Sequence, residues 1–107
     1  MKTLKFREPL PEMILRGDKT KTWRINDKRG ISKGDELSLC YNNAVEFAKA
    51  KAVHVTEKTF AQLTEEDFIG HEHYNSSEEM YRTYSGYYGF KVQPQTNVKI
   101  IEFRLKE

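Results

Sequence analysis

The apolar residues of this chain come in short segments that alternate with polar residues, and this alternation restricts the fold most. Such segments lie at 2–6, 19–25, 36–41, 45–55 and 98–105. A period of two places every second side chain on one face of a strand, so the segments predict a half-buried sheet. The longest unbroken apolar run is only a few residues, so no transmembrane helix is expected. The first segment predicts a strand rather than a secretion signal.

Three short helices are predicted between the strands. Pro11 stands where a helix can begin, and Gly17 provides a C-terminal cap for it. Thr64 and Ser76 are each followed by acidic residues, which the helix dipole favours in a first turn. The glycines within 86–89 are expected to end the last helix and to leave aromatic residues in a loop.

The predicted fold class is mostly β with short helices (α+β). About five strands with two or three short helices indicate a small, mostly antiparallel β-barrel. A β-α-β-β-α-β arrangement is less favoured, because the helices are short and start close to one another. The 107 residues contain no repeat or linker, so we expect a single domain over 1–107.

The formal net charge is +2, but the charged residues are distributed unevenly along the chain. Residues 1–34 hold ten Lys/Arg and four Asp/Glu, a balance of +6, whereas 57–80 hold one Lys and seven Asp/Glu, a balance of −6. A basic segment suggests a polyanion or phosphate partner, although the two segments could also pair with each other on the surface. The single cysteine, Cys40, excludes an intramolecular disulfide and predicts a reducing, cytoplasmic location.

The segment from Gly17 to Arg24 holds the polar side chains best suited to chemistry. It has one glycine and lacks the phosphate-binding G-x-x-x-x-G-K pattern. A lysine and a threonine can act as base and nucleophile, but Lys19 and Thr22 lie on opposite faces of an ideal strand. They meet only if the chain turns near 18–21. The alternative is a solvated, basic strand edge.

Three blocks of the sequence resemble the ASCH domain, a small PUA-like β-barrel, and the resemblance covers nearly the whole chain. The blocks are Gly17-x-Lys19-Thr20-x-Thr22-x-Arg24, then Lys33-Gly34-Asp35 before a strand, and Tyr87-Tyr88-Gly89 followed by Ile101-Glu102-Phe103. The resemblance implies a cleft beside the first block that binds RNA or a nucleotide-like ligand.

One compact bacterial branch of this family removes acetate from N4-acetylcytidine with a lysine, a threonine and a glutamate. By resemblance these are Lys19, Thr22 and Glu72. Thr22 would attack the amide, Lys19 would serve as base, and Glu72 would activate a water. Lys19 must then lose its proton near neutral pH. Burial, or crowding by Lys21 and Arg24, favours that loss, and Glu72 opposes it.

The residues expected to bind the substrate or RNA are Thr20, Lys21, Trp23 and Arg24 of the first block, together with Tyr87 and Tyr88. The two tyrosines are named because exposed aromatic rings in a glycine-bounded loop are suited to stacking on bases. The alternative to hydrolysis is a non-catalytic RNA-binding module that uses the same basic cleft. The partner is therefore RNA or a modified nucleoside. We expect no DNA, membrane, metal or cofactor, and favour a monomer.

Several positions depart from the hydrolase branch. Trp23 replaces an aliphatic residue, the stretch 85–97 is longer, and His71 and His73 flank Glu72. Scattered histidines and one cysteine make a poor metal set, so the two histidines are expected to be solvated loop residues. With Glu72 in the acidic segment, the charge split predicts a cleft with one basic and one acidic wall.

Overall fold

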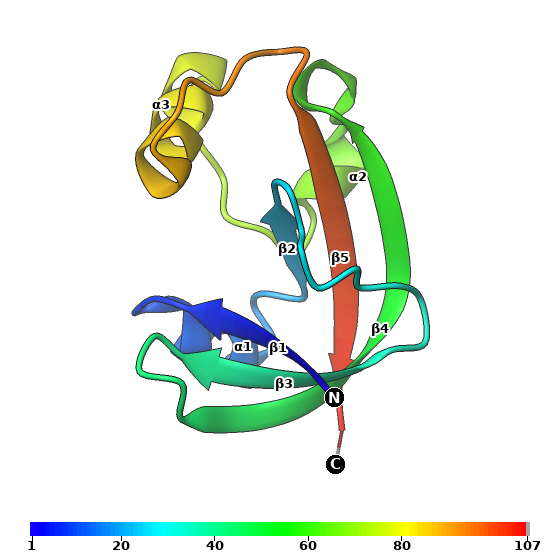
Figure 1. The fold of residues 1–107 in the computed structure, drawn as a ribbon. Helices are drawn as coiled ribbons and strands as arrows, with labels where there is room; N and C mark the ends of the chain where they lie inside the picture. The colour runs from blue at the N-terminus through cyan, green and yellow to red at the C-terminus, as the bar shows by residue number, and fades with distance from the viewer. Residues whose placement is uncertain (107) are drawn as a thin grey trace.

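Five strands form one curved sheet in the order β1-β3-β4-β5-β2 in the computed structural model, which describes residues 1–106 (Figure 1). β1 pairs in parallel with β3, and all other neighbours are antiparallel. The strands are β1 (Lys2–Phe6), β2 (Lys21–Arg24), β3 (Glu36–Tyr41), β4 (Glu46–Thr59) and β5 (Asn97–Leu105). The sheet curls into a partly closed barrel, which confirms the expected mostly β, α+β class.

The curl comes from the two long strands. β4 and β5 run antiparallel along most of the molecule and bow together (Figure 1). The register shifts between Ala52 and His54 in this pairing, and again between Leu39 and Cys40 where β3 meets β4. A bulge adds local twist and bends its strand, so these two positions help a single sheet wrap around a core.

The helices are α1 (Leu10–Arg16), α2 (Glu65–Phe68) and α3 (Ser77–Tyr88), with one 3-10 turn at Phe60–Gln62. The backbone N–H of Glu79 donates to Ser76 Oγ (3.1 Å), so the expected N-cap of α3 is confirmed. The end of α3 differs from the prediction. The helix continues through Gly86 and ends at Gly89, whose φ of 74° is left-handed. A glycine inside a helix costs about 1 kcal/mol.

The buried apolar side chains form two clusters, and β5 contributes to both. Successive strand residues point to opposite faces, so Ile100 enters one cluster and Ile101 the other. The cluster inside the curl includes Ile14 of α1. The second cluster includes Trp23 of β2 and Tyr84 of α3. The free edges β1 and β2 are thus supported by different halves of the core.

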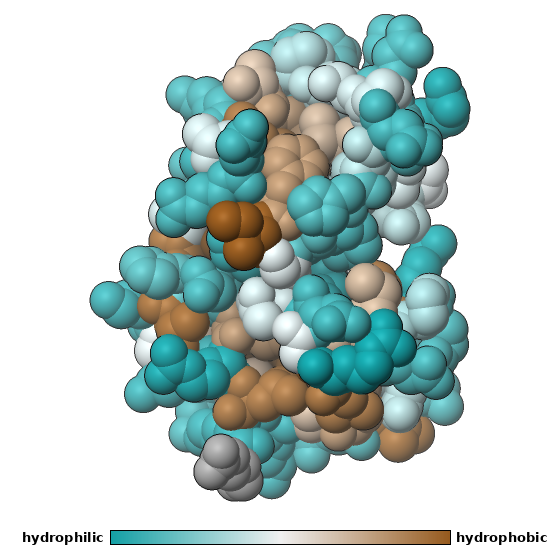
Figure 2. Space-filling model, turned by 180° about the vertical axis from the view of Figure 1, so that it is seen from behind, coloured by the Kyte–Doolittle hydropathy of each residue, from teal (hydrophilic) through white to brown (hydrophobic). Residues whose placement is uncertain are grey.

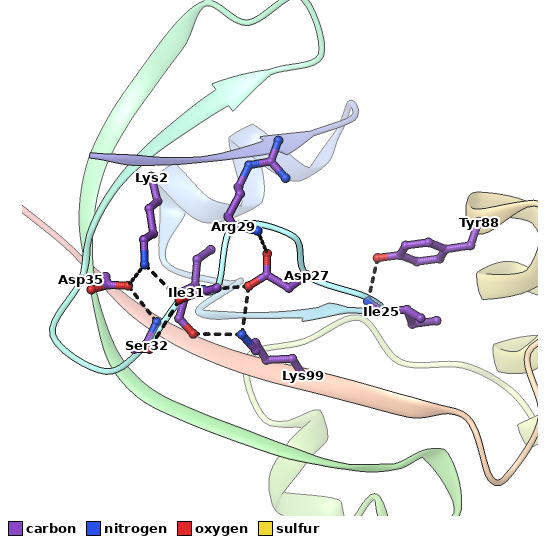
Figure 3. A network of polar contacts seen from close by, with 10 residues as sticks. Lys2, Ile25, Asp27, Arg29, Ile31, Ser32, Asp35, Tyr88 and Lys99 are labelled. Carbon is purple, nitrogen blue, oxygen red and sulfur yellow. Dashed lines mark hydrogen bonds and ion pairs between the residues drawn. The ribbon is translucent and has the colours of Figure 1, made fainter.

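A polar network holds the loop that follows β2 (Figure 3). The carboxylate of Asp27 accepts hydrogen bonds from the backbone N–H of Ile31 (2.8 Å) and from Lys99 Nζ (3.0 Å). Burial would raise the pKa of Asp27, but these hydrogen bonds leave it lowered. At the other end of the loop, the N–H of Ile25 donates to the Tyr88 hydroxyl (3.0 Å). This contact ties α3 to the end of β2.

No helix in residues 1–106 is long and apolar enough to cross a membrane. The face opposite to that of Figure 1 is mostly hydrophilic, with apolar side chains in small separate areas (Figure 2). Cys40 is buried and carries a free thiol.

Candidate functional site

A cleft of about 300 Å³ opens near the two free edges of the sheet, β1 and β2. Phe6 and Leu10 border the cleft on the side of the core cluster inside the curl, and Tyr84 borders it on the side of the second cluster. Seven of the residues predicted from the sequence line this cleft: Lys19, Thr22, Trp23, Arg24, Glu72, Tyr87 and Tyr88. Segments far apart in the chain therefore meet here.

Lys19 lies just before β2, so it is not held to the alternation of the strand. Its side chain is 2% exposed, and Nζ donates to Glu72 Oε2 (2.5 Å) and to the Lys21 carbonyl (2.7 Å). Burial lowers the pKa of Lys19, the charge and hydrogen bond of Glu72 oppose this, and Arg24 adds to the lowering. The net pKa is lowered, so burial outweighs the carboxylate.

Thr22 points into the same cleft from β2 and is buried. Its Oγ1 accepts a hydrogen bond from Arg24 Nε (3.1 Å), so the Thr22 hydroxyl proton is directed elsewhere. Arg24 Nη2 also donates to the carbonyl of Lys5 (2.8 Å), and the guanidinium lies 4.9 Å from the ring centre of Phe6. Arg24 thus joins the two free edges of the sheet and orients Thr22.

Glu72 reaches Lys19 because the preceding loop is pinned to β2. The backbone N–H groups of Thr20 (2.8 Å) and Lys21 (3.1 Å) both donate to the carbonyl of Gly70. Gly70 has a φ of 77°, and a Cβ built there would lie 2.1 Å from Thr20 Oγ1. Glycine is therefore required at this contact. Burial would raise the pKa of Glu72, but Lys19 and His71 leave it lowered.

Two predicted binding residues lie outside the lining of the cleft. Thr20 packs against Gly70, and its carbonyl accepts from the N–H of Phe103 (3.0 Å). Lys21 Nζ donates to the carbonyl of Glu66 (2.6 Å) and borders a different depression. Both residues hold the loop that presents Glu72. The motif alone does not show whether its residues have this structural role or bind a ligand.

His71 is not the solvated loop residue expected from the sequence, since it is only 5% exposed. Its ring stacks on Trp23 with 3.8 Å between centroids and 12° between planes. Nδ1 lies 3.0 Å from the Glu72 carbonyl, which can only accept, so Nδ1 carries the proton and Nε2 accepts from the Tyr84 hydroxyl (3.1 Å). Burial and Lys19 lower the pKa of His71 to about 4, so the ring is neutral at pH 7.

Trp23 lines the cleft but belongs to the core. It is 2% exposed and makes edge contacts with Phe60 and Phe68. Its indole Nε1 has no hydrogen-bond partner among the side chains and backbone of residues 1–106. The indole of Trp23 therefore provides the aromatic plane on which the buried His71 stacks.

The last turn of α3 brings two tyrosines to the cleft. Tyr87 is 43% exposed, and the Arg7 guanidinium lies 4.3 Å from its ring centre. Tyr88 is held by the hydrogen bond from Ile25. The sequence placed both tyrosines in a loop, whereas they belong to the last turn of α3.

The prediction that one wall of the cleft is acidic is wrong. Of the seven acidic residues in the segment 57–80, only Glu72 lines the cleft, whereas four cationic side chains do: Lys5, Arg7, Lys19 and Arg24. Other acids serve local structure instead. Asp67 accepts from the backbone of Thr64 (2.8 Å) and pairs with Lys58 (2.9 Å). In residues 1–106, no three His, Cys, Asp or Glu side chains are grouped to hold a metal ion.

Comparison with solved structures identifies the architecture. An ASCH domain from Lactobacillus crispatus superposes with a TM-score of 0.68 at 13% identity, covering 89% of this chain and 69% of that one. An ASCH protein of Zymomonas mobilis gives 0.65 at 13% identity, with 95% and 66% covered. A protein described as hypothetical gives 0.75 at 22% identity over 99% and 100%.

No protein-family model matches the sequence, and no curated protein does either. At these identities the structural likeness establishes the fold alone. The five-stranded curl, the cleft at its open edge and these superpositions together show that the chain has an ASCH-like, PUA-type fold.

Proposed function

We propose that this protein hydrolyses the amide of an acylated pyrimidine nucleoside such as N4-acetylcytidine. One observation carries the proposal: the buried Lys19–Glu72 pair, 2.5 Å apart, shares a cleft with the oriented hydroxyl of Thr22. A nucleophile, a lysine whose pKa is lowered by burial and a carboxylate are the groups that a two-step acyl transfer needs.

Before the first step Lys19 must lose its ammonium proton to solvent, a loss that burial favours because it lowers the pKa of Lys19. Thr22 Oγ1 then attacks the carbonyl carbon of the acetamide, and its proton passes to the free amine of Lys19. Arg24 supports the attack, since its donated hydrogen bond stabilises negative charge on Oγ1. The carbon–nitrogen bond then breaks, and the departing amine takes the proton from Lys19. Cytidine leaves, and the acetyl group remains as an ester on Thr22.

In the second step, Glu72 removes a proton from a water molecule, and the resulting hydroxide attacks the ester. The bond between the acetyl carbon and Thr22 Oγ1 breaks, Oγ1 takes back the proton that Glu72 accepted, and the product leaves as acetic acid, which ionises to acetate. The low pKa of Glu72 keeps it ionised and able to accept this proton. His71 stays neutral and therefore leaves the Glu72 carboxylate to Lys19.

The test follows cytidine release from N4-acetylcytidine by chromatography. Wild-type protein should hydrolyse N4-acetylcytidine. The variants Lys19→Met, Thr22→Val and Glu72→Gln should each lower kcat by about 10²-fold or more. Matched exchanges at the exposed residues Lys33, Thr56 and Glu57 should leave the rate unchanged. Absence of turnover on N4-acetylcytidine and on related acylated pyrimidine nucleosides would contradict the proposal.

The second candidate is a non-catalytic RNA-binding module. The surplus of cations in the cleft favours it, but the carboxylate of Glu72 opposes binding of a phosphate directly beside Lys19. If this candidate holds, an RNA mobility shift should weaken with salt and disappear in Arg24→Ala, with no cytidine released by wild-type protein. Release of cytidine that depends on Thr22 would exclude it.

A further inference from the structure

Three cations at the cleft have no counter-charge. Lys5, Arg7 and Arg24 all line it, and within the described part of the chain no carboxylate lies within 4.0 Å of their nitrogens. Some cations elsewhere are paired, for example Lys99 with Asp27 at 3.0 Å and Lys58 with Asp67 at 2.9 Å. Of the four cations that line the cleft, only Lys19 has a carboxylate partner, and the other three are left without one.

Of the three cations, Arg24 is destabilised most by the lack of a counter-charge, because it is partly buried and its neighbours are aromatic rings and a carbonyl. Burial lowers the pKa of its guanidinium, and the opposing effects of Tyr88, Tyr84 and Asp27 are smaller. Two of the five guanidinium N–H donors are used, by Thr22 and by the Lys5 carbonyl, so three remain. A desolvated cation with free donors is stabilised by an anionic ligand that it can bind in bidentate fashion.

Arg7 is held in place without losing its donors. Its guanidinium lies over the Tyr87 ring at 4.3 Å, and among the hydrogen bonds of residues 1–106 its side chain makes none. A cation–π contact fixes the plane of the group at low cost, while all of its N–H edges stay free. Arg7 follows β1 and Tyr87 belongs to α3, so this contact joins two separate segments that line the cleft.

Glu72, the one carboxylate that lines the cleft, does not neutralise the positive charge of these three cations. Glu72 is already paired with Lys19 at 2.5 Å, and His71 is neutral. The remaining charge at the cleft is therefore positive. An ordinary nucleoside is uncharged on its sugar and would leave these three cations unmatched, whereas a phosphate on the sugar would meet them.

We propose that Arg7, Lys5 and Arg24 form a phosphate subsite, so that the ligand of this cleft is a phosphorylated pyrimidine nucleoside rather than the free nucleoside. This inference rests on the proposed nucleoside-directed function of the cleft. The phosphate can belong to a mononucleotide or to an RNA strand, and both present the same oxygens to the arginines. Arg24 would face the ligand near Thr22, and Arg7 and Lys5 would hold the phosphate further out.

The test compares the binding of cytidine and cytidine 5′-monophosphate by isothermal titration calorimetry, which needs no hydrolysis. Wild-type protein should bind the monophosphate at least about tenfold more tightly at low salt, and the preference should shrink as salt rises. Arg7→Ala and Lys5→Ala should remove most of the preference without weakening cytidine. Arg82→Ala and Lys33→Ala, which change exposed cations outside the cleft, should keep it.

A second arm separates the two sources of phosphate. A cytidine-containing trinucleotide with no terminal phosphate presents only internal phosphates. If it binds as tightly as the monophosphate and depends equally on Arg7, the source is an RNA strand; if it binds like cytidine, the source is a mononucleotide. Equal affinity for cytidine and its monophosphate, including no detectable binding of either, would overturn the subsite. That result is independent of whether N4-acetylcytidine is hydrolysed.

Discussion

The ammonium group of Lys19 lies 2.5 Å from the carboxylate of Glu72, although 53 residues separate them in the chain. The lysine is 2% exposed and the glutamate side chain 23%. This contact joins the basic N-terminal segment to the acidic loop and sets the charge state of the cleft. A partly buried pair of this kind is sensitive to the loss of either partner.

Removing one partner of this pair should destabilise the fold more than removing both. Glu72→Ala leaves the buried ammonium unpaired and should lower the free energy of unfolding by about 2–4 kcal/mol, whereas adding Lys19→Met should recover part of it. Urea unfolding of both single variants and the double variant measures the coupling. Asp18→Ala, which breaks the exposed pair with Arg16, should change little. Strictly additive effects of the two cleft changes would contradict this account.

The neutral His71 should make the fold sensitive to mild acid. Its pKa is about 4 in the folded protein against an ordinary 6.5, so between these values the unfolded chain binds a proton that the folded chain does not. Stability should therefore fall as pH drops from 6.5 to 4, by about 3 kcal/mol in total from this residue.

The check is the slope of the unfolding free energy between pH 6.5 and 5, where carboxylates titrate little. His71→Asn keeps a donor for the Glu72 carbonyl and should flatten the slope. His73→Asn, at an exposed position, should leave it as in the wild type. An unchanged slope in the His71 variant would mean that another group causes the acid sensitivity.

Gly70 and Gly86 should respond to alanine with opposite signs. At Gly70 the φ of 77° and the contact with Thr20 both oppose a Cβ, so we expect a loss of about 2–4 kcal/mol. Gly86 is helical with open space around it, so Gly86→Ala should stabilise by about 0.5–1 kcal/mol. Gly30→Ala, where φ is 62° but nothing is near, isolates the backbone cost. Equal losses at Gly70 and Gly30 would show that the Thr20 contact is unimportant.

Arg24→Lys should lower kcat by about tenfold or more while leaving the fold intact. The lysine keeps the positive charge but cannot bond Thr22 and the Lys5 carbonyl with the fork of a guanidinium. Steady-state kinetics on N4-acetylcytidine measures it, with Arg29→Lys at an exposed loop position as the control. Wild-type kcat in the Arg24 variant would exclude a role in orienting the nucleophile.

Local signals in the sequence identify most of the fold. Alternation located the five strands, and Gly17, Thr64 and Ser76 marked helix ends through interactions within one turn. Of the two glycines expected to end α3, only Gly89 does so, with a left-handed cap, and the helix tolerates the cost of about 1 kcal/mol that Gly86 adds.

The site is less accessible to local reasoning. Lys19, Thr22 and Glu72 were named together through a family resemblance, and nothing in their own neighbourhoods predicts that they meet. The burial of His71 depends on the rings of Trp23 and Tyr84, which lie far away in sequence. The prediction of an acidic wall failed because an acidic residue such as Asp67 caps a helix and pairs with Lys58 instead of lining the cleft.

The most direct measurement is the mass of the protein after incubation with N4-acetylcytidine. In Glu72→Gln the water-activating carboxylate is missing, so the acetyl ester on Thr22 should accumulate. The intact protein should gain the mass of one acetyl group, located by fragmentation on the peptide that contains Thr22, while wild-type protein releases cytidine and acetate. An unmodified Glu72→Gln protein together with a wild-type protein that releases neither product would contradict the proposed hydrolysis.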